Sequence, residues 1–197
     1  DNDGSENFTR RVISSTHTFI SRDALACADV DGDGDVDIVS ATYHGISVFW
    51  NNGNQSFSLQ TFNDMPYDAI MFGIALKDVD GDNDIDIVAS GERESVVWLE
   101  NLNDGSHGFT LRTISYAYSA HINYAVLALD MDGDSDVDIV SGNTGDKKVH
   151  LYINDGSQTF GDKVIGSFNY PLALSVGDID GDNDVDVLVA GSTSGHL

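Results

Sequence analysis

Hydrophobic and polar residues alternate in short runs along the chain, and turn residues separate the runs. Residues 46–50, 95–99 and 148–153 are such runs, and polar turns rich in Asn, Asp and Gly follow each of them. β-branched and aromatic residues at a two-residue period, bounded by such turns, predict antiparallel strands. A sustained 3.6-residue period, which would predict a helix, occurs in no window of the sequence.

An acidic nine-residue segment recurs four times, at residues 29–37, 78–86, 130–138 and 178–186. Consecutive apolar residues such as Ile38-Val39 and Ile87-Val88 follow each copy. Such a run predicts a strand buried on both faces, because a sheet with one wet face would alternate. Sheets stacked face to face around an axis explain this pattern. Small residues before each segment suit the crowded inner strand of such a stack, and they are Ala26, Ala28, Ala75, Ala128 and Gly177.

Four short strands in every repeat of about 50 residues predict an all-β fold of β-propeller blades, each a sheet of four antiparallel strands. A parallel β-helix is the structural alternative, but its repeats are much shorter. We interpret residues 1–197 as a single array of about four repeats. Residues 1–22 hold the outer strand of a split blade, the ranges 23–62, 72–114 and 124–165 are complete blades, and residues 172–197 hold the inner strands of the split blade. We expect the array to be part of a larger propeller or to be completed by a neighbouring chain, and closure into a four-bladed ring is the third option.

The chain of 197 residues is strongly acidic, with 33 Asp and Glu against 9 Lys and Arg and a net charge of −24. This charge repels phosphates and anionic lipids, so we expect no nucleic-acid partner. No apolar run approaches the roughly 18 residues of a membrane helix, and we expect no direct membrane insertion. The single cysteine, Cys27, lies in an apolar stretch and is predicted to be a small core residue.

Aspartates at alternate positions of each acidic segment repel one another, by about 4 kcal/mol for two charges 4 Å apart at an effective dielectric of 20. A hard cation reverses this repulsion, and Ca²⁺ takes six to eight oxygen ligands in flexible geometry. We therefore predict about four Ca²⁺ ions, one in each segment. The side-chain ligands at positions 1, 3, 5 and 9 are Asp29, Asp31, Asp33 and Asp37; Asp78, Asp80, Asp82 and Asp86; Asp130, Asp132, Asp134 and Asp138; and Asp178, Asp180, Asp182 and Asp186. The position-7 residues, which would bind through their backbone carbonyls, are Asp35, Asp84, Asp136 and Asp184.

Position 6 is predicted to adopt a left-handed conformation, which Gly and Asn tolerate better than other residues. Gly34, Asn83 and Asn183 suit it, whereas Ser135 does so less readily and predicts that the third segment is the weakest. Three alternatives to these calcium loops remain: EF-hands, solvated acidic turns without metal, and Mg²⁺ sites. An EF-hand needs flanking helices and a Glu at position 12, and Mg²⁺ avoids sites made only of protein ligands.

The repeated Asp-x-Asp-Gly-Asp-x-Asp-x-Asp, followed by Ile-Val and by Leu-Tyr-x-Asn-Asp-Gly downstream, resembles the FG-GAP/VCBS repeat family. This family includes the calcium-binding blades of the integrin α-subunit propeller. The resemblance implies a calcium-binding β-propeller in a secreted or cell-surface protein. Phe72-Gly73 stands where a Phe-Gly belongs, but the Gly-Ala-Pro part is absent, and the short repeats look more like the VCBS type.

The resemblance implies an extracellular or cell-surface module for adhesion, recognition or structural scaffolding, with a protein or glycan ligand or copies of itself as partners. The alternatives are a subunit of a self-assembling surface filament and a lectin or glycan-processing domain. In such propellers the loops opposite the calcium usually bind, and here they hold Tyr67, Tyr116, Tyr118, His121, Tyr124 and Tyr170. Alternatively, these rings pack between blades.

Catalytic motifs such as Gly-x-Ser-x-Gly and His-Glu-x-x-His are absent, so we expect no enzymatic activity. Sequons at Asn7 and Asn54 predict N-glycosylation of an extracellular protein.

Overall fold

The computed structural model describes residues 9–14, 24–54, 56–117 and 121–192. Three complete sheets each have four antiparallel strands, paired in chain order. Blade 1 comprises β1 (Leu25–Ala28), β2 (Asp37–Thr42), β3 (Gly45–Asn51) and β4 (Phe57–Phe62). Blade 2 comprises β5 (Met71–Lys77), β6 (Asp86–Gly91), β7 (Val96–Asn101) and β8 (Phe109–Ser115). Blade 3 comprises β9 (Asn123–Leu129), β10 (Asp138–Asn143), β11 (Lys148–Asn154) and β12 (Phe160–Ser167).

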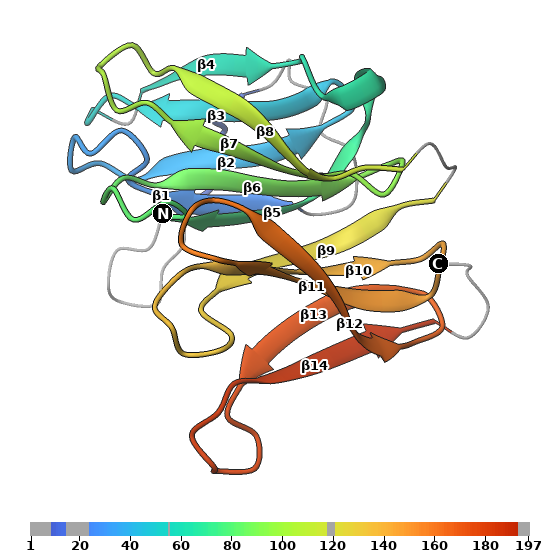
Figure 1. Ribbon diagram of the computed structural model, residues 1–197. Coiled ribbons are helices and arrows are strands. Elements are labelled where there is room, and N and C mark those ends of the chain that lie inside the picture. Colours follow the sequence, from blue (N-terminus) through green and yellow to red (C-terminus); the bar gives the residue numbers. More distant parts are fainter. Residues whose placement is uncertain (1–8, 15–23, 55, 118–120, 193–197) are drawn as a thin grey trace.

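A half-blade of two strands, β13 (Pro171–Gly177) and β14 (Asp186–Gly191), follows blade 3. The sheets stack in chain order from blade 1 to the half-blade without closing into a ring (Figure 1). The other regular element among the described residues is a short 3-10 turn, η1 (Pro66–Asp68). The predicted all-β fold of four-stranded antiparallel blades is therefore confirmed, and a parallel β-helix is excluded.

Apolar side chains from neighbouring sheets form the core. On β6, Ile87 and Ala89 pack in a cluster shared with blade 1, whereas Val88 packs in a cluster shared with blade 3. All three residues are fully buried. The consecutive apolar positions after the acidic segment are thus buried on both faces of the sheet, as the sequence pattern predicts.

Residues on the two outermost faces of the stack are exposed although their counterparts are buried. Leu188 on β14 is 60% exposed, whereas the matching Val39, Val88 and Val140 are fully buried. The prediction that Cys27 is a core residue is wrong, because its side chain is exposed. Cys27 lies on the face of blade 1 that no described sheet covers, so an apolar local sequence does not bury it.

The predicted outer strand within residues 1–22 falls mostly outside the described residues, and the described residues 9–14 form no strand. Residues 193–197 also lie outside the described part. Completion of the half-blade by another strand therefore stays a prediction. Among the described residues, no helix is both long and apolar enough to cross a membrane.

Candidate metal centres

The four acidic segments form loops that connect the first two strands of each sheet. We call them loop 1 (residues 29–37), loop 2 (78–86), loop 3 (130–138) and loop 4 (178–186), with positions 1 to 9 in each. The backbone at position 6 is left-handed in all four, with φ of 95°, 72°, 79° and 72° at Gly34, Asn83, Ser135 and Asn183. This confirms the predicted conformation, including at Ser135. Strands flank every loop, so the EF-hand alternative is wrong.

The aspartate at position 1 organises each loop by accepting hydrogen bonds from its backbone. In loop 2, Asp78 Oδ1 accepts from the amides of Gly81 and Asp82 at 2.8 and 3.1 Å, and Asp78 Oδ2 accepts from Asn83 at 3.0 Å. The position-5 aspartate Asp82 accepts from the amide of Asp84 at 3.1 Å. These bonds turn the backbone inward and hold several carboxylates close together.

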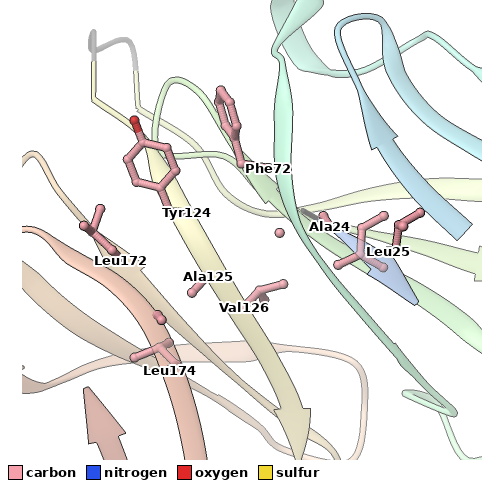
Figure 2. A pocket seen from close by; sticks show the side chains of 11 residues that line it. Ala24, Leu25, Phe72, Tyr124, Ala125, Val126, Leu172 and Leu174 are labelled. Carbon is pink, nitrogen blue, oxygen red and sulfur yellow. The ribbon is translucent and has the colours of Figure 1, made fainter. Parts of the chain in front are cut away.

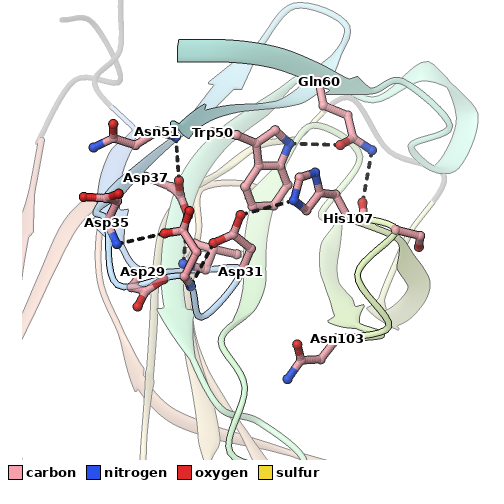
Figure 3. Close-up of polar contacts among 12 residues, drawn as sticks. Asp29, Asp31, Asp35, Asp37, Trp50, Asn51, Gln60, Asn103 and His107 are labelled. Atoms are coloured by element: carbon pink, nitrogen blue, oxygen red, sulfur yellow. Dashed lines mark hydrogen bonds and ion pairs between the residues drawn. The ribbon is translucent and has the colours of Figure 1, made fainter. Parts of the chain in front are cut away.

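The aspartate at position 9 joins the loop to the sheet. Asp86 is fully buried, and its Oδ2 accepts from the Val79 amide at 2.9 Å while its Oδ1 accepts from the Asn101 amide at 2.7 Å. Asp37 and Asp138 are buried in the same way and accept the same pair of bonds. Figure 3 shows the contact between Asn51 and Asp37 in loop 1. Sequence reasoning predicted these residues as closing ligands but missed their role in holding the loop against the third strand.

Each loop brings together three carboxylate oxygens, all within 4.8 Å of one another, that could hold one metal ion. The triads are Asp29, Asp31 and Asp33; Asp78, Asp80 and Asp86; Asp130, Asp132 and Asp138; and Asp178, Asp180 and Asp186. The other predicted ligands lie in the same loops but outside these triads, and they are Asp37, Asp82, Asp134, Asp182 and the position-7 residues Asp35, Asp84, Asp136 and Asp184.

Two orphaned oxygens show that the triads suit a cation. Asp29 Oδ1 and Asp80 Oδ1 are buried and have no hydrogen-bond partner. A buried carboxylate oxygen without a donor is costly, because it has lost water and gained nothing in exchange. A hard cation between the carboxylates supplies the missing partner, so the donor set fits a metal such as calcium.

Burial and mutual repulsion raise the pKa values of loop carboxyls. Burial, opposed by hydrogen bonds from the Asn101 and Val79 amides, raises the pKa of Asp86 to about 6. Burial and the charges of Asp82 and Asp86 raise the pKa of Asp84 to about 7. Burial likewise raises the pKa of Asp37, Asp80 and Asp138. In the absence of a cation, the folded chain therefore binds protons at these loop carboxyls more tightly than the unfolded chain does.

A local difference in blade 2 explains the exceptional environment of Asp84. In blade 1 the Asp35 carboxylate lies close to Gly53. A Cβ atom added to Gly53 would be 2.7 Å from Asp35 Oδ2. The equivalent of Gly53 in blade 2 is Asn103, since both amides donate to the side chain of the Asn two residues earlier. A side chain at this place would collide with a carboxylate in the position that Asp35 occupies, and blade 2 carries the Asn103 side chain there. Asp84 is buried instead, and neither of its carboxylate oxygens has a partner.

These pKa shifts predict that the calcium-free protein is more stable in mild acid than at neutral pH. A carboxyl with a raised pKa in the folded state binds protons more tightly when folded, so stability falls as pH rises through the interval between its unfolded and folded pKa. For Asp84 and Asp86 this interval runs from 3.8 to about 7 and about 6. Thermal melts in EDTA should therefore show a melting temperature several degrees higher at about pH 5.5 than at about pH 7.5.

Calcium supplies the control for this pH effect. Burial lowers the pKa of His150, but the Asp162 and Asp146 carboxylates raise it more, so His150 adds stability of the same sign in acid. Saturating calcium should remove or reverse the aspartate contribution, because protons and calcium compete, and leave the His150 contribution in place. A calcium-free melting temperature that falls steadily from about pH 7.5 to about pH 5.5 would contradict the raised pKa values.

Asparagines at the ends of the third strands tie neighbouring sheets together beside the loops. Asn101 Nδ2 donates to the Val30 carbonyl of loop 1 at 2.8 Å, and Asn154 Nδ2 donates to the Val79 carbonyl of loop 2 at 3.3 Å. The recurrence of Asn after each alternating run was the available sequence signal. The acidic loops are therefore fixed both within their own sheet and from the next one.

Several of the predicted ligand-binding aromatic residues make contacts between blades. Tyr124 on β9 packs against Phe72 on β5 with ring centroids 5.3 Å apart, and Lys147 lies over the Tyr170 ring at 5.6 Å. His121 Nδ1 lies 3.1 Å from Glu94 Oε1. Tyr118 lies outside the described residues, and so does the side chain of Tyr67. For Tyr124, packing between blades is the observed arrangement.

The inner strands line an open cavity of about 590 Å³. Its walls come from β1, β5, β9 and β13, and Figure 2 shows Tyr124, Phe72, Leu172 and Leu174 around it. The lining residues are almost all apolar, and the tyrosine hydroxyl of Tyr124 is the titratable side-chain group among them. The acidic loops, rather than this cavity, are therefore the candidate functional centres.

Comparison with known families identifies the repeat. The model for the FG-GAP-like repeat matches residues 29–89, 78–141 and 130–189, so each match begins at an acidic loop and extends into the strand after the next loop. The chain belongs to the FG-GAP-like repeat family. No curated protein matches the sequence.

Solved β-propeller structures resemble this array of FG-GAP-like repeats in fold. A lectin from Agrocybe aegerita, solved to explain specific recognition of non-reducing terminal N-acetylglucosamine, superposes with a TM-score of 0.56 and 24% identity. BBS1N in complex with ARL6DN superposes with a TM-score of 0.55 and 13% identity. These alignments cover 84% and 85% of this chain, but 46% and 50% of the matched chains. The FG-GAP-like array thus spans about half the length of the propellers that it matches.

Proposed function

We propose that the chain is a calcium-binding β-propeller repeat module that serves adhesion, recognition or structural scaffolding outside the cell. The carboxylate triad that recurs in every loop carries this proposal. A chance acidic cluster would not recur in the same loop of four successive repeats, where the position-6 amide donates to the position-1 aspartate each time. FG-GAP-like repeats often bind calcium, which supports the assignment.

The donor set favours calcium over other ions. All side-chain donors in the triads are carboxylate oxygens, which hard cations prefer to nitrogen or sulfur ligands. Calcium accepts variable geometry and coordination number, whereas Mg²⁺ demands a near-ideal octahedron and retains water. When bound, calcium would neutralise the crowded carboxylates and fix the turn between the first two strands of each sheet. The chain's own residues bind and position the ion.

Isothermal titration calorimetry tests the proposal. Calcium added to the chelator-treated protein should bind at a stoichiometry approaching four ions per chain, with dissociation constants of about 10⁻⁴–10⁻³ M if the sites resemble other extracellular modules. Magnesium at the same concentration should bind more weakly. Absence of calcium binding in the millimolar range would refute this function.

The partner is proposed to be a protein, a glycan or a further copy of the chain. The lectin, which recognises N-acetylglucosamine, and BBS1N, which is in complex with ARL6DN, support a protein or glycan ligand because both resemble this chain in fold. A glycan array that includes terminal N-acetylglucosamine tests the lectin alternative, and light scattering against protein and calcium concentration tests self-assembly.

N-glycosylation at Asn7 and Asn54 is a separate proposal. Asn54 is exposed, and Asn7 lies outside the described residues. Mass measurement before and after glycosidase treatment tests this modification.

A further inference from the structure

We propose that His107 and Gln158 are positioning residues for the metal loops of the preceding blade, so that the calcium affinity of a loop depends on the blade that follows it. The inference rests on the proposed calcium function. It assigns roles to two residues outside the acidic loops, at positions that carry no metal ligand.

The same contact occurs at two successive blade junctions. His107 Nε2 of blade 2 lies 3.1 Å from Asp31 Oδ2 of loop 1, and Gln158 Nε2 of blade 3 lies 3.4 Å from Asp80 Oδ2 of loop 2. Asp31 and Asp80 are both position-3 aspartates and members of the metal triads. In each case a nitrogen donor from one blade therefore meets the same ligand of the blade before it.

The two donors also occupy equivalent places in their own blades. Each lies two residues before the phenylalanine that begins the outer strand, Phe109 or Phe160. Each has a left-handed backbone, with φ of 54° at His107 and 64° at Gln158. Because this conformation is uncommon for residues other than glycine, its recurrence marks a specific turn that aims the side chain at the neighbouring loop.

Blade 1 fixes the His107 ring in this orientation. The imidazole stacks on the Trp50 indole with centroids 4.3 Å apart and an interplanar angle of 19°. Gln60 closes the cluster, since its Oε1 accepts from Trp50 Nε1 at 2.9 Å and its Nε2 donates to the His107 carbonyl at 3.1 Å (Figure 3). The ring is held by a side-chain stack and by its own backbone, so Nε2 has little freedom to leave Asp31.

A hydrogen bond to one oxygen of a carboxylate fixes the group and leaves its other oxygen oriented for a cation. Asp80 Oδ2 accepts from Gln158, whereas Asp80 Oδ1 is buried without a partner. Asp132 and Asp180, which hold position 3 in loops 3 and 4, have no donor of this kind among the described residues and are exposed. Hydrogen bonds to a ligating carboxylate fix its orientation, and loss of such a partner typically weakens metal binding about 10- to 100-fold.

Calorimetric calcium titrations of the whole chain test this role with H107A, H107Q and Q158A. H107A should weaken one of the sites about 10-fold and leave the others unchanged, and Q158A should weaken a different one. H107Q should recover most of the wild-type affinity, because glutamine is the donor used at the next junction. The matched control is H44A, an exposed histidine in the turn between β2 and β3, and it should leave the isotherm unchanged.

The outcomes separate this inference from the proposed function. If the wild-type chain binds no calcium, the proposed function fails. The wild-type chain could instead bind calcium while H107A and Q158A bind it with the wild-type affinity. These residues would then only join the blades, and the positioning role would be wrong. A fall in the calcium-free melting temperature of H107A, with calcium affinity intact, would also overturn it. Should H107A not fold, Q158A tests the role alone, because its side chain makes one long contact at an exposed turn.

Discussion

Chelation of calcium should lower the melting temperature of this chain by about 10–20 °C at neutral pH. A ligand present at ten times its dissociation constant stabilises the folded state by about 1.4 kcal/mol per site, so four sites contribute about 5 to 6 kcal/mol. For a domain of this size, each kcal/mol corresponds to about 2–4 °C. Differential scanning calorimetry in millimolar calcium and then in excess EDTA measures the shift.

Restored calcium and a ligand-deficient variant control the chelation experiment. Calcium added beyond the EDTA should recover the original melting temperature, whereas magnesium should recover little of it. A variant with Asn at the first position of every loop should melt at the same temperature with and without calcium, and its substitutions are D29N, D78N, D130N and D178N. An equal melting temperature of the wild-type chain in calcium and in EDTA would contradict occupied sites.

Substitution of Asp86 by Ala should destabilise even the calcium-free protein, by about 2 to 5 kcal/mol. The substitution leaves two backbone donors, the amides of Val79 and Asn101, without the carboxylate that accepts from both of them. The carboxylate that both donors contact is fully buried, so its loss leaves two buried amides without a partner. Chemical denaturation in EDTA measures the loss without any contribution from bound metal.

Two variants separate the hydrogen bonds of Asp86 from its charge. D86N keeps one acceptor oxygen and removes the buried charge, so it should be less destabilising than D86A in EDTA and should still lose calcium affinity. D186A is the matched control in the half-blade, because Asp186 is only partly buried and its Oδ2 accepts from the Ile179 amide at 2.9 Å, while no described third strand supplies a second donor there. Equal destabilisation by D86A and D186A would show that burial of the carboxylate is not the cause.

The repeat pattern predicted the fold because each local signal recurs in every copy. The apolar pairs after the acidic loops, such as Ile87-Val88, can be buried on both faces of a sheet only if sheets stack. Ile87 and Val88 are both fully buried. Left-handed backbone at position 6 followed from the residue types, and Ser135 adopts it with the others because the surrounding loop imposes it. Comparison of the four copies within one chain therefore gave much of the information that an alignment of related sequences gives.

The environments of individual aspartates were harder to predict. Asp35 and Asp84 occupy the same position of the motif, yet Asp84 alone is buried with a pKa of about 7. We attribute the difference to Asn103, which lies in a turn about twenty residues away where blade 1 has Gly53. The contact of His107 with Asp31 joins residues from different blades, and no local pattern specifies it. The prediction that Cys27 is a core residue was wrong for a related reason. Burial of a side chain depends on whether a neighbouring sheet covers it and not on the strand itself.

A crystal structure determined in millimolar calcium tests the central claim most directly. Anomalous difference maps should show one peak in each of the four loops, at calcium–oxygen distances of about 2.3–2.6 Å from the triad carboxylates. Loops that hold only water in such crystals, with the carboxylates turned toward solvent, would contradict the account.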